Sequence, residues 1–126
     1  MSEGAARKRR AGHDFGLRAE TIAALWLRAK LYRILARRYR VQGGEIDIVA
    51  KRGDTIAFVE VKARAGIEDA MIAITPQKQR RMSVAAARWL AVNPWAVNFT
   101  LRADAVFVAP RSLPRHIENV MELRIG

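Results

Sequence analysis

The first half of the chain opens with a helix-like segment. Asp14 can cap a helix that runs to about Lys30, because apolar residues recur at helical spacing between them. We expect these residues to face the core, and they are Ile22, Leu25, Trp26 and Ala29. Trp26 is therefore interpreted as a core residue and not as a platform on which nucleic-acid bases stack.

Strand-like segments follow this helix. Tyr32–Val41 is the first, and the pair Gly43-Gly44 ends it. Two segments of alternating polar and apolar residues come next, Glu45–Lys51 and Thr55–Ala63. The intervening Arg52-Gly53-Asp54 is typical of a tight turn, so we predict that the two segments form a β-hairpin.

The second half predicts one more helix and one or two strands. Thr75-Pro76 supplies an N-cap and a first-turn proline for a helix that continues to about Ala91, and Asn93-Pro94 stops it. Ala103–Ala109 is an apolar strand, and the segment from Arg115 onward is expected to add an edge strand, although its helix and strand signals conflict. The order αβββαβ(β) predicts an α/β domain whose mixed sheet has a central hairpin flanked by helices.

Length and composition limit the classes of protein. The 126 residues fit one domain, which we assign to 14–126 after a flexible basic tail over 1–13. Cysteine is absent, which excludes disulfides and thiolate metal sites. No apolar stretch reaches the roughly 18 residues of a membrane span, and the basic run Arg7-Lys8-Arg9-Arg10 precedes no apolar segment typical of a secretory signal. We therefore expect a cytoplasmic protein without a membrane partner.

Charge favours a polyanionic partner. The formal net charge is +11, and clustered Lys and Arg release counterions from phosphate backbones. Nucleic acid is the interpretation that we prefer. Anionic membrane surfaces, ribosomal RNA or an arginine-rich composition without function would give the same balance.

The predicted hairpin brings acidic side chains together. A turn centred on Gly53-Asp54 pairs Asp47 with Glu60 and Glu45 with Lys62, and strand alternation puts Ile46 and Ile48 together on the opposite face. Directly opposed residues lie about 4.5–5.5 Å apart, where like charges destabilise a sheet. A divalent cation such as Mg²⁺ removes this penalty, because it prefers carboxylate oxygens. Asp47, Glu60 and Lys62 therefore suggest metal-assisted phosphodiester hydrolysis.

A structural alternative remains for the same residues. Glu45 and Lys62 could form an ordinary cross-strand ion pair, while Asp47 and Glu60 face water on a half-exposed sheet. The β-branched neighbours of these acids favour a central hairpin instead, where a carboxylate is costly unless it has a partner.

Two strings carry a family resemblance. Asp47, followed after twelve residues by Glu60-Val61-Lys62, resembles the PD-(D/E)xK motif of restriction-endonuclease-like folds, and GEIDIVA with FVEVKAR resembles the YraN-type family of small bacterial nuclease-like proteins. That family is similar in fold to archaeal Holliday-junction resolvases. The likeness extends to Glu20, to the strand that starts at Tyr32, to Lys78 and to Arg102-Ala103-Asp104.

This chain departs from the family pattern at two positions. Ala19 and Leu31 stand where the family usually has glycine. Alanine suits a helix better than glycine does, so Ala19 is a mild change. Leu31 would be strained if the backbone there needs a positive φ.

The resemblance implies roles for individual residues. Asp47 and Glu60 would bind Mg²⁺ or Mn²⁺, with the Val61 carbonyl as a third ligand and Glu20 contributing directly or through a water. Lys62 would orient or activate the attacking water, and Glu45 would be a supporting residue. Glu20 could equally be a solvent-facing helix residue. Residues at the start of the second helix are candidates for phosphate contacts, against the alternative of an ordinary solvated face, and they are Gln77, Lys78, Arg80 and Arg81. His13 and His116 receive no role.

Three functions compete at this point. The first is a divalent-metal-dependent endonuclease acting on DNA, including branched DNA, for which a homodimer would follow because resolvase-like chemistry needs two active sites. The second is a nucleic-acid-binding module that retains the nuclease fold with weak or no catalysis. The third is a basic protein associated with RNA or the ribosome, which leaves the carboxylates unexplained.

Overall fold

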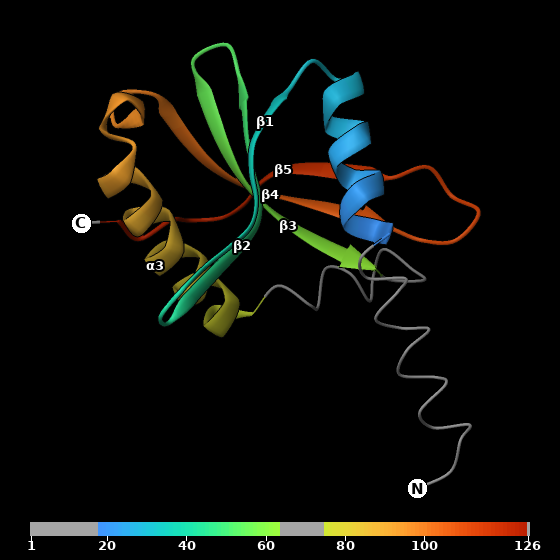
Figure 1. Ribbon diagram of the computed structural model, residues 1–126. Helices are drawn as coiled ribbons and strands as arrows, with labels where there is room; N and C mark the ends of the chain where they lie inside the picture. Colours follow the sequence, from blue (N-terminus) through green and yellow to red (C-terminus); the bar gives the residue numbers. More distant parts are fainter. Residues whose placement is uncertain (1–17, 64–74, 126) are drawn as a thin grey trace, which may run out of the picture.

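A five-stranded sheet forms the centre of the protein. The computed structural model describes residues 18–63 and 75–125, and a helix covers 18–29 (Figure 1). The strands of the first half are β1 (Arg33–Val41), β2 (Gly44–Arg52) and β3 (Thr55–Ala63). Helix α3 (Pro76–Val92), the 3₁₀ turn η1 (Pro94–Ala96), β4 (Thr100–Val108) and β5 (Arg115–Met121) follow. The predicted element order and the α/β class are confirmed, and the segment from Arg115 is a strand.

The sheet is mixed, in the order β1-β2-β3-β4-β5. Neighbouring strands are antiparallel except for β3 and β4, which are parallel because the chain crosses between them through α3. The hairpin of β2 and β3 is central, as predicted. Its turn contains Gly53 at φ 60°, and the pairing of Arg52 with Thr55 is the predicted register.

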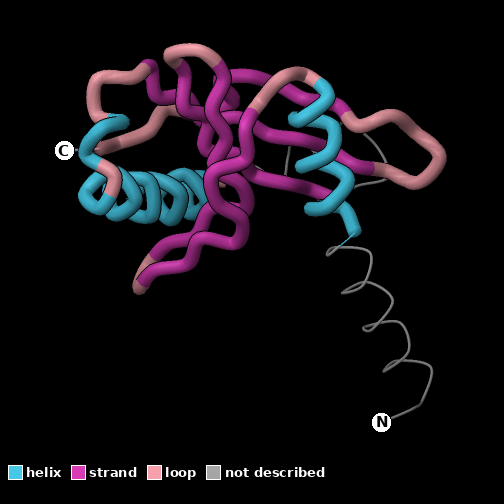
Figure 2. The backbone as a smooth tube through the Cα atoms, turned by 45° about the horizontal axis from the view of Figure 1, so that its top comes forward, coloured by secondary structure: helices cyan, strands magenta, loops and turns pink. Residues whose placement is uncertain are grey.

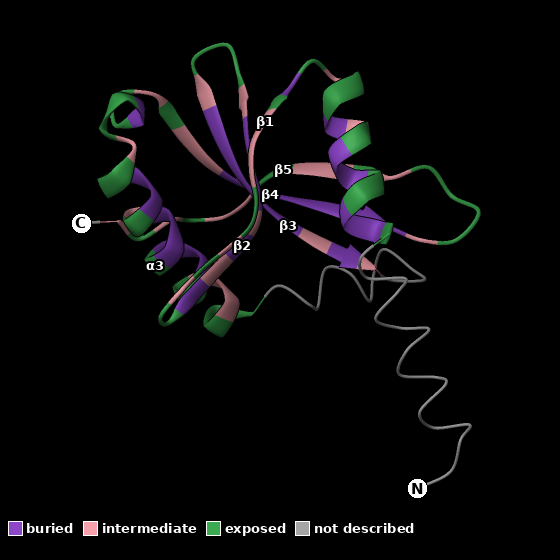
Figure 3. Cartoon of the chain, viewed as in Figure 1, coloured by how far each residue is buried: buried purple, intermediate pink, exposed green. Residues whose placement is uncertain are grey.

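The two helices lie on opposite sides of the sheet (Figure 2). The helix over 18–29 packs on one face, where its core partners include Ile48, Val59 and Val106. Helix α3 packs on the other face, where Met82, Ala86 and Trp89 join a core that includes Phe58. Figure 3 shows the buried residues concentrated on the inner strands and on the helix sides that meet them. Within residues 18–63 and 75–125, neither helix is long and apolar enough to cross a membrane.

The first helix turns a different side to the core than its sequence predicts. None of the buried residues belongs to the predicted stripe, and they are Ala19, Glu20, Ala23, Ala24 and Leu27. Ile22 is 38% exposed and Leu25 57% exposed, so the prediction for this stripe was wrong. Apolar residues occur around nearly the whole helix, so periodicity could not choose between the two sides. The three alanines allow the helix to approach the sheet closely.

The turn after this helix has the conformation that strains Leu31. Its φ is 72°, and the residue is exposed. The amide of Leu31 donates to the carbonyl of Arg28, and the amide of Tyr32 donates to that of Leu27, which is the hydrogen-bond pattern of a Schellman helix end. Glycine is the usual residue at such a position, so this chain accommodates a leucine in a left-handed conformation.

Strand β2 changes face at Asp47. Ile48 belongs to the core beneath the first helix, whereas Ile46 belongs to the core beneath α3, so the prediction that they share a face was wrong. The β1 pairs on either side are Arg37 with Ile48 and Tyr39 with Ile46. Arg38, between them, has a φ of 52°. A left-handed residue interrupts strand alternation, which explains the change of face.

Strands β2 and β3 also separate at this point. Among the described residues their pairing ends at Ile48 with Val59, so neither Asp47–Glu60 nor Glu45–Lys62 is a ladder pair, and both predicted pairs were wrong. Beyond Ile48, β2 passes directly over α3 at Gly44. A Cβ at Gly44 would lie 2.4 Å from the carbonyl oxygen of Arg81 and 2.8 Å from the amide nitrogen of Ala85. Glycine therefore lets β2 pack against the helix backbone.

Candidate functional site

Asp47 lies where β2 leaves β3. Its Oδ2 accepts a hydrogen bond of 2.8 Å from the backbone amide of Val61. This amide is two residues beyond Val59, the last residue of β3 that pairs with β2. The carboxylate thus satisfies a β3 amide after the ladder has ended, and this contact holds Asp47 beside the Glu60-Val61-Lys62 segment.

Glu60 is the centre of a buried ion-pair group. It is 8% exposed, and Lys62, from the same strand, is 9% exposed. The Nζ atoms of Lys62 and Lys78 each lie 2.9 Å from the same oxygen, Oε1 of Glu60. Lys78 reaches this oxygen from the first turn of α3, whose start Thr75 caps by accepting from the Lys78 amide at 3.2 Å.

Glu20 approaches from the first helix. It is 8% exposed, and its Oε2 accepts a hydrogen bond of 3.1 Å from Nε of Arg38, the residue with the left-handed backbone. Its other oxygen, Oε1, is buried and has no hydrogen-bond partner among the described residues. Glu20 is therefore not the solvent-facing helix residue that the sequence left open. A buried carboxylate oxygen without a partner is costly and points to a missing ligand.

The pKa of Asp47 shows that these carboxyl groups act on one another. Burial, followed by the charge of Glu60, raises this pKa from 3.8 to about 7. The Val61 amide opposes the rise, and the charges of Glu20 and Glu45 add to it. Four acidic side chains thus share one electrostatic environment although they come from three elements. Asp47 is the one with no cation at ion-pair distance in the described part of the chain.

The two lysines control the ionisation of Glu60. Burial alone would raise the pKa of Glu60, but the hydrogen bonds and charges of Lys62 and Lys78 outweigh burial and lower it. Burial lowers the pKa of Lys62, and Lys78 adds to this effect against the opposing attraction of Glu60. Burial would also lower the pKa of Lys78, but its contacts with Lys62 and Glu60 prevail and raise it. Glu60 is therefore ionised at neutral pH, whereas Asp47 is partly protonated.

The donor chemistry suits a hard cation, although the donors do not surround a common point. In residues 18–63 and 75–125 no three carboxylate or imidazole side chains are arranged to hold one ion. Mg²⁺ needs only one or two carboxylates and completes its shell with water. Asp47, Glu60 and the unpartnered Oε1 of Glu20 supply oxygens of that kind, so the residues fit a divalent cation in type.

The predicted phosphate contacts fall into two groups. Gln77 and Arg80 are exposed on the first turns of α3, and among the described residues neither side chain has an ion pair or a side-chain hydrogen bond. Lys78 forms an ion pair with Glu60, and Nη2 of Arg81 lies 3.8 Å from Oε1 of Glu45. Glu45 also lies 3.9 Å from Arg40, so its cationic neighbours are these two arginines and not Lys62. The separation of β2 from β3 explains this difference.

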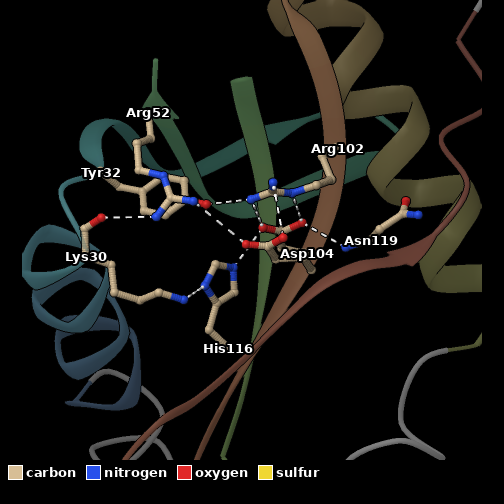
Figure 4. A network of polar contacts seen from close by, with 8 residues as sticks. Lys30, Tyr32, Arg52, Arg102, Asp104, His116 and Asn119 are labelled. Atoms are coloured by element: carbon tan, nitrogen blue, oxygen red, sulfur yellow. Dashed lines mark hydrogen bonds and ion pairs between the residues drawn. The ribbon is translucent and has the colours of Figure 1, made fainter. Parts of the chain in front are cut away.

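A second buried polar group went unrecognised in the sequence. Asp104, on β4, is fully buried and accepts two hydrogen bonds of 2.8 Å from Arg102, one of 2.8 Å with Nε2 of His116 and one of 3.1 Å from the amide of Asn119 (Figure 4). These contacts outweigh burial and lower the pKa of Asp104. Arg102-Ala103-Asp104 was visible in the sequence, whereas nothing there marked His116.

This second group connects elements that are distant in sequence. Nη2 of Arg102 donates to the hydroxyl of Tyr32 at 2.5 Å, and Nζ of Lys30 lies 2.5 Å from Nδ1 of His116 (Figure 4). The guanidinium of Arg52 lies 4.5 Å from the centre of the Tyr32 ring. The group therefore holds the end of the first helix against β4 and β5.

The sequence profile of "Uncharacterised protein family UPF0102" matches residues 19–108. The chain belongs to this family. A UPF0102 protein of Methylocella silvestris is 57% identical over 118 residues, covering 94% of this chain and 95% of the relative. Another from Methylorubrum extorquens is 57% identical over 116 residues, covering 92% and 91%. The UPF0102 protein bll0669 of Bradyrhizobium diazoefficiens is 56% identical over 113 residues, covering 90% and 85%. The family match spans β1 to β4, α3 and most of the first helix, and with them every residue of the site.

Proposed function

We propose that this UPF0102 chain is a divalent-metal-dependent DNA endonuclease with a restriction-endonuclease-like fold. The observation that carries the proposal is the gathering of buried Glu20 and Glu60 around the half-buried Asp47, whose pKa their charges raise, beside Lys62, with one oxygen of Glu20 left without a partner among the described residues. A sheet stabilised only by packing would not gather these acids, because each is costly to bury.

Asp47, Glu60, the carbonyl of Val61 and Glu20 would hold the cation, Mg²⁺ or Mn²⁺. When bound, such an ion supplies positive charge to a phosphate oxygen and lowers the pKa of a water. The hydrogen bond from the Val61 amide keeps the carboxylate of Asp47 beside Val61 on β3. Glu60 fixes the Nζ of Lys62 at 2.9 Å, so that the ammonium can orient a water or neutralise a phosphate oxygen.

The charge of the chain supports a nucleic-acid substrate. The formal net charge is +11, and exposed arginines lie on β1 at Arg33, Arg37, Arg38 and Arg40 and on α3 at Arg80 and Arg81. Contacts of this kind with phosphates give an affinity that falls steeply with salt. Branched DNA and a homodimer with two active sites remain part of the proposal.

A binding module without catalysis is the second candidate, and one observation favours it. Both ammonium groups near Glu60 already neutralise its carboxylate, and no three acidic or imidazole donors in the described chain surround one point. A protein that only binds nucleic acid could keep such a neutralised group.

A cleavage assay separates the two candidates. Duplex, flap and four-way-junction DNA would be incubated with Mg²⁺ or Mn²⁺ and the wild type, Lys62→Ala or Arg88→Ala, an exposed arginine on α3 that serves as control. We expect cleavage by the wild type and the control, and its loss in Lys62→Ala with little change in DNA affinity. A wild type as inert as Lys62→Ala, yet bound to DNA with a steep salt dependence, would replace the nuclease by the binding module.

A further inference from the structure

One oxygen of the candidate site is held by two of the protein's own cations. Oε1 of Glu60 lies 2.9 Å from Nζ of Lys62 and 2.9 Å from Nζ of Lys78. The Lys62 side chain is 11% exposed and comes from the same strand, whereas that of Lys78 is 34% exposed and comes from α3. The two lysines therefore differ in how easily each can leave Glu60.

We propose that Lys78 is an internal counter-ion, which competes with the divalent cation for Glu60 and, once displaced, binds a phosphate of the DNA. This inference rests on the proposed function, since it concerns the same metal site. It assigns Lys78 two alternating partners, where the sequence suggested a phosphate contact alone.

Binding of the cation through Oε1 of Glu60 requires the competition. A carboxylate oxygen has two lone pairs, and two ammonium donors occupy both of those on Oε1. A cation that approaches this oxygen must displace at least one donor. Two ammonium groups and a divalent cation around one oxygen would also repel one another strongly at low dielectric.

Lys78 is the donor that can leave. Its side chain is three times as exposed as that of Lys62, so its ammonium regains water at lower cost. Glu60 is the only carboxylate at ion-pair distance from Lys78 within the described residues, and Asp47 attracts its ammonium group only from farther away. It stands on the first turns of α3 near Gln77 and Arg80, the exposed candidates for phosphate contact.

The exchange of Lys78 between Glu60 and a phosphate couples metal binding to DNA binding. In the metal-free protein Lys78 is engaged with Glu60, and in the metal-bound protein it is available to a phosphate. Metal should therefore strengthen DNA binding, and by reciprocity DNA should strengthen metal binding. Removing Lys78 should weaken this coupling, whereas removing a neighbouring cation with no partner should not.

The first experiment measures metal binding to the full chain without DNA. Mn²⁺ would be titrated calorimetrically into the wild type, Lys78→Met and Arg80→Met, which lose the same charge on the same helix. We expect Lys78→Met to bind Mn²⁺ about tenfold more tightly, and Arg80→Met to change the dissociation constant by less than about twofold. Lys78→Gln should repeat the tenfold gain if the methionine variant fails to fold. Equal affinities of Lys78→Met and the wild type would overturn the competition.

The second experiment measures DNA affinity with Ca²⁺ and with a chelator, and a gel checks that the DNA stays intact. Lys78→Met should lose about tenfold in affinity with Ca²⁺ and less than about twofold without it. Arg80→Met should lower the DNA affinity by the same factor with Ca²⁺ and with the chelator. The reason is that Arg80 can contact a phosphate without first leaving a carboxylate. A loss in Lys78→Met that is independent of Ca²⁺ would contradict the exchange.

The two proposals fail in different ways. If the wild type and Lys78→Met bind no divalent cation, the metal site of the proposed function is wrong and the competition falls with it. If the wild type binds the cation and Lys78→Met binds it no better, the nuclease proposal stands and only the role of Lys78 is wrong.

Discussion

Two groups of buried charges in this protein differ in how completely they are satisfied. In the Asp104 group, Arg102, His116 and the Asn119 amide give the carboxylate four hydrogen bonds, and its side chain is fully buried. In the Glu60 group, Glu60 has two ammonium partners on one oxygen, Asp47 has only an amide, and Glu20 keeps a buried oxygen without a partner among the described residues.

The difference teaches how to separate a structural charge from a functional one. A buried carboxylate whose acceptor sites are filled stabilises the fold and has nothing left for a ligand. In the Glu60 group, the charges of the neighbouring carboxylates add to the raised pKa of Asp47, and an oxygen of Glu20 stays unfilled among the described residues, so the group costs stability that a bound cation would restore. The contrast predicts opposite signs when each group loses a charge.

The largest effect is expected at Asp104. Replacing it by alanine leaves the half-buried cation of Arg102 and the buried ring of His116 without their acceptor, so we expect a loss of about 3–5 kcal/mol in the free energy of unfolding. Urea denaturation measures it. Glu118→Ala is the matched control, because its ion pairs with Arg52 and Arg102 are 3.9 and 3.5 Å long and its side chain is 48% exposed. Its cost should stay below about 1 kcal/mol. Similar losses of stability in both variants would show that the buried hydrogen bonds of Asp104 contribute no more than an exposed ion pair.

Replacing Asp47 by asparagine is expected to stabilise the metal-free protein. Its pKa rises from 3.8 in the unfolded chain to about 7 in the folded protein, so the folded state binds the proton more tightly. Stability therefore falls as pH rises from about 4 to about 7. Asp47→Asn keeps an oxygen for the Val61 amide and lacks this dependence. It should be more stable than the wild type by on the order of 4 kcal/mol at pH 8 without metal, and nearly equal to it at pH 4.

Metal should reverse that order. Mg²⁺ that binds only the folded state raises the stability of the wild type according to its concentration over the dissociation constant. Asp47→Asn should lose most of this increment in a thermal melt. The same increment in both proteins would mean that the cation binds elsewhere.

Replacing Glu20 should change the stabilisation by Mg²⁺ more than it changes the stability of the metal-free protein. Glu20→Gln removes a charge but leaves an oxygen for Arg38, whose side chain is 44% exposed, so the metal-free protein should change by no more than about 1 kcal/mol. Its response to Mg²⁺ should weaken measurably in the same melt. Glu45→Gln, at a side chain that is 39% exposed, should leave the response close to that of the wild type. A stronger effect of Glu45→Gln would place the cation closer to Glu45, at the start of β2.

The smallest effect is expected at Leu31, in the turn that precedes Tyr32 of the Asp104 group. Leu31 has a φ of 72°, so Leu31→Gly should stabilise the protein by about 1 kcal/mol. Ala29→Gly, two residues earlier in the helix, should cost about the same amount, because glycine is a poor helix former. Losses in both variants would show that the leucine side chain contributes contacts that outweigh its strain.

Local chemistry determined a large part of this structure. Gly53 and its neighbours fixed the hairpin turn and the pairing of Arg52 with Thr55, and Thr75-Pro76 fixed the start of α3. The element order followed from periodicity and from these turn residues. Asp47, Glu60 and Lys62 were recognisable as one group because they lie on two strands joined by that turn.

Tertiary structure decided what periodicity leaves open. A helix with apolar residues around most of its circumference can bury either side, and packing against the sheet chose the alanines over Ile22 and Leu25. The left-handed Arg38 and the passage of Gly44 over α3 turned β2 at Asp47, so a register counted from the turn held only as far as Ile48. The contacts between Lys78 and Glu60 and between His116 and Asp104 join residues distant in the chain. Such contacts arise when whole elements pack, and for that reason no local pattern announces them.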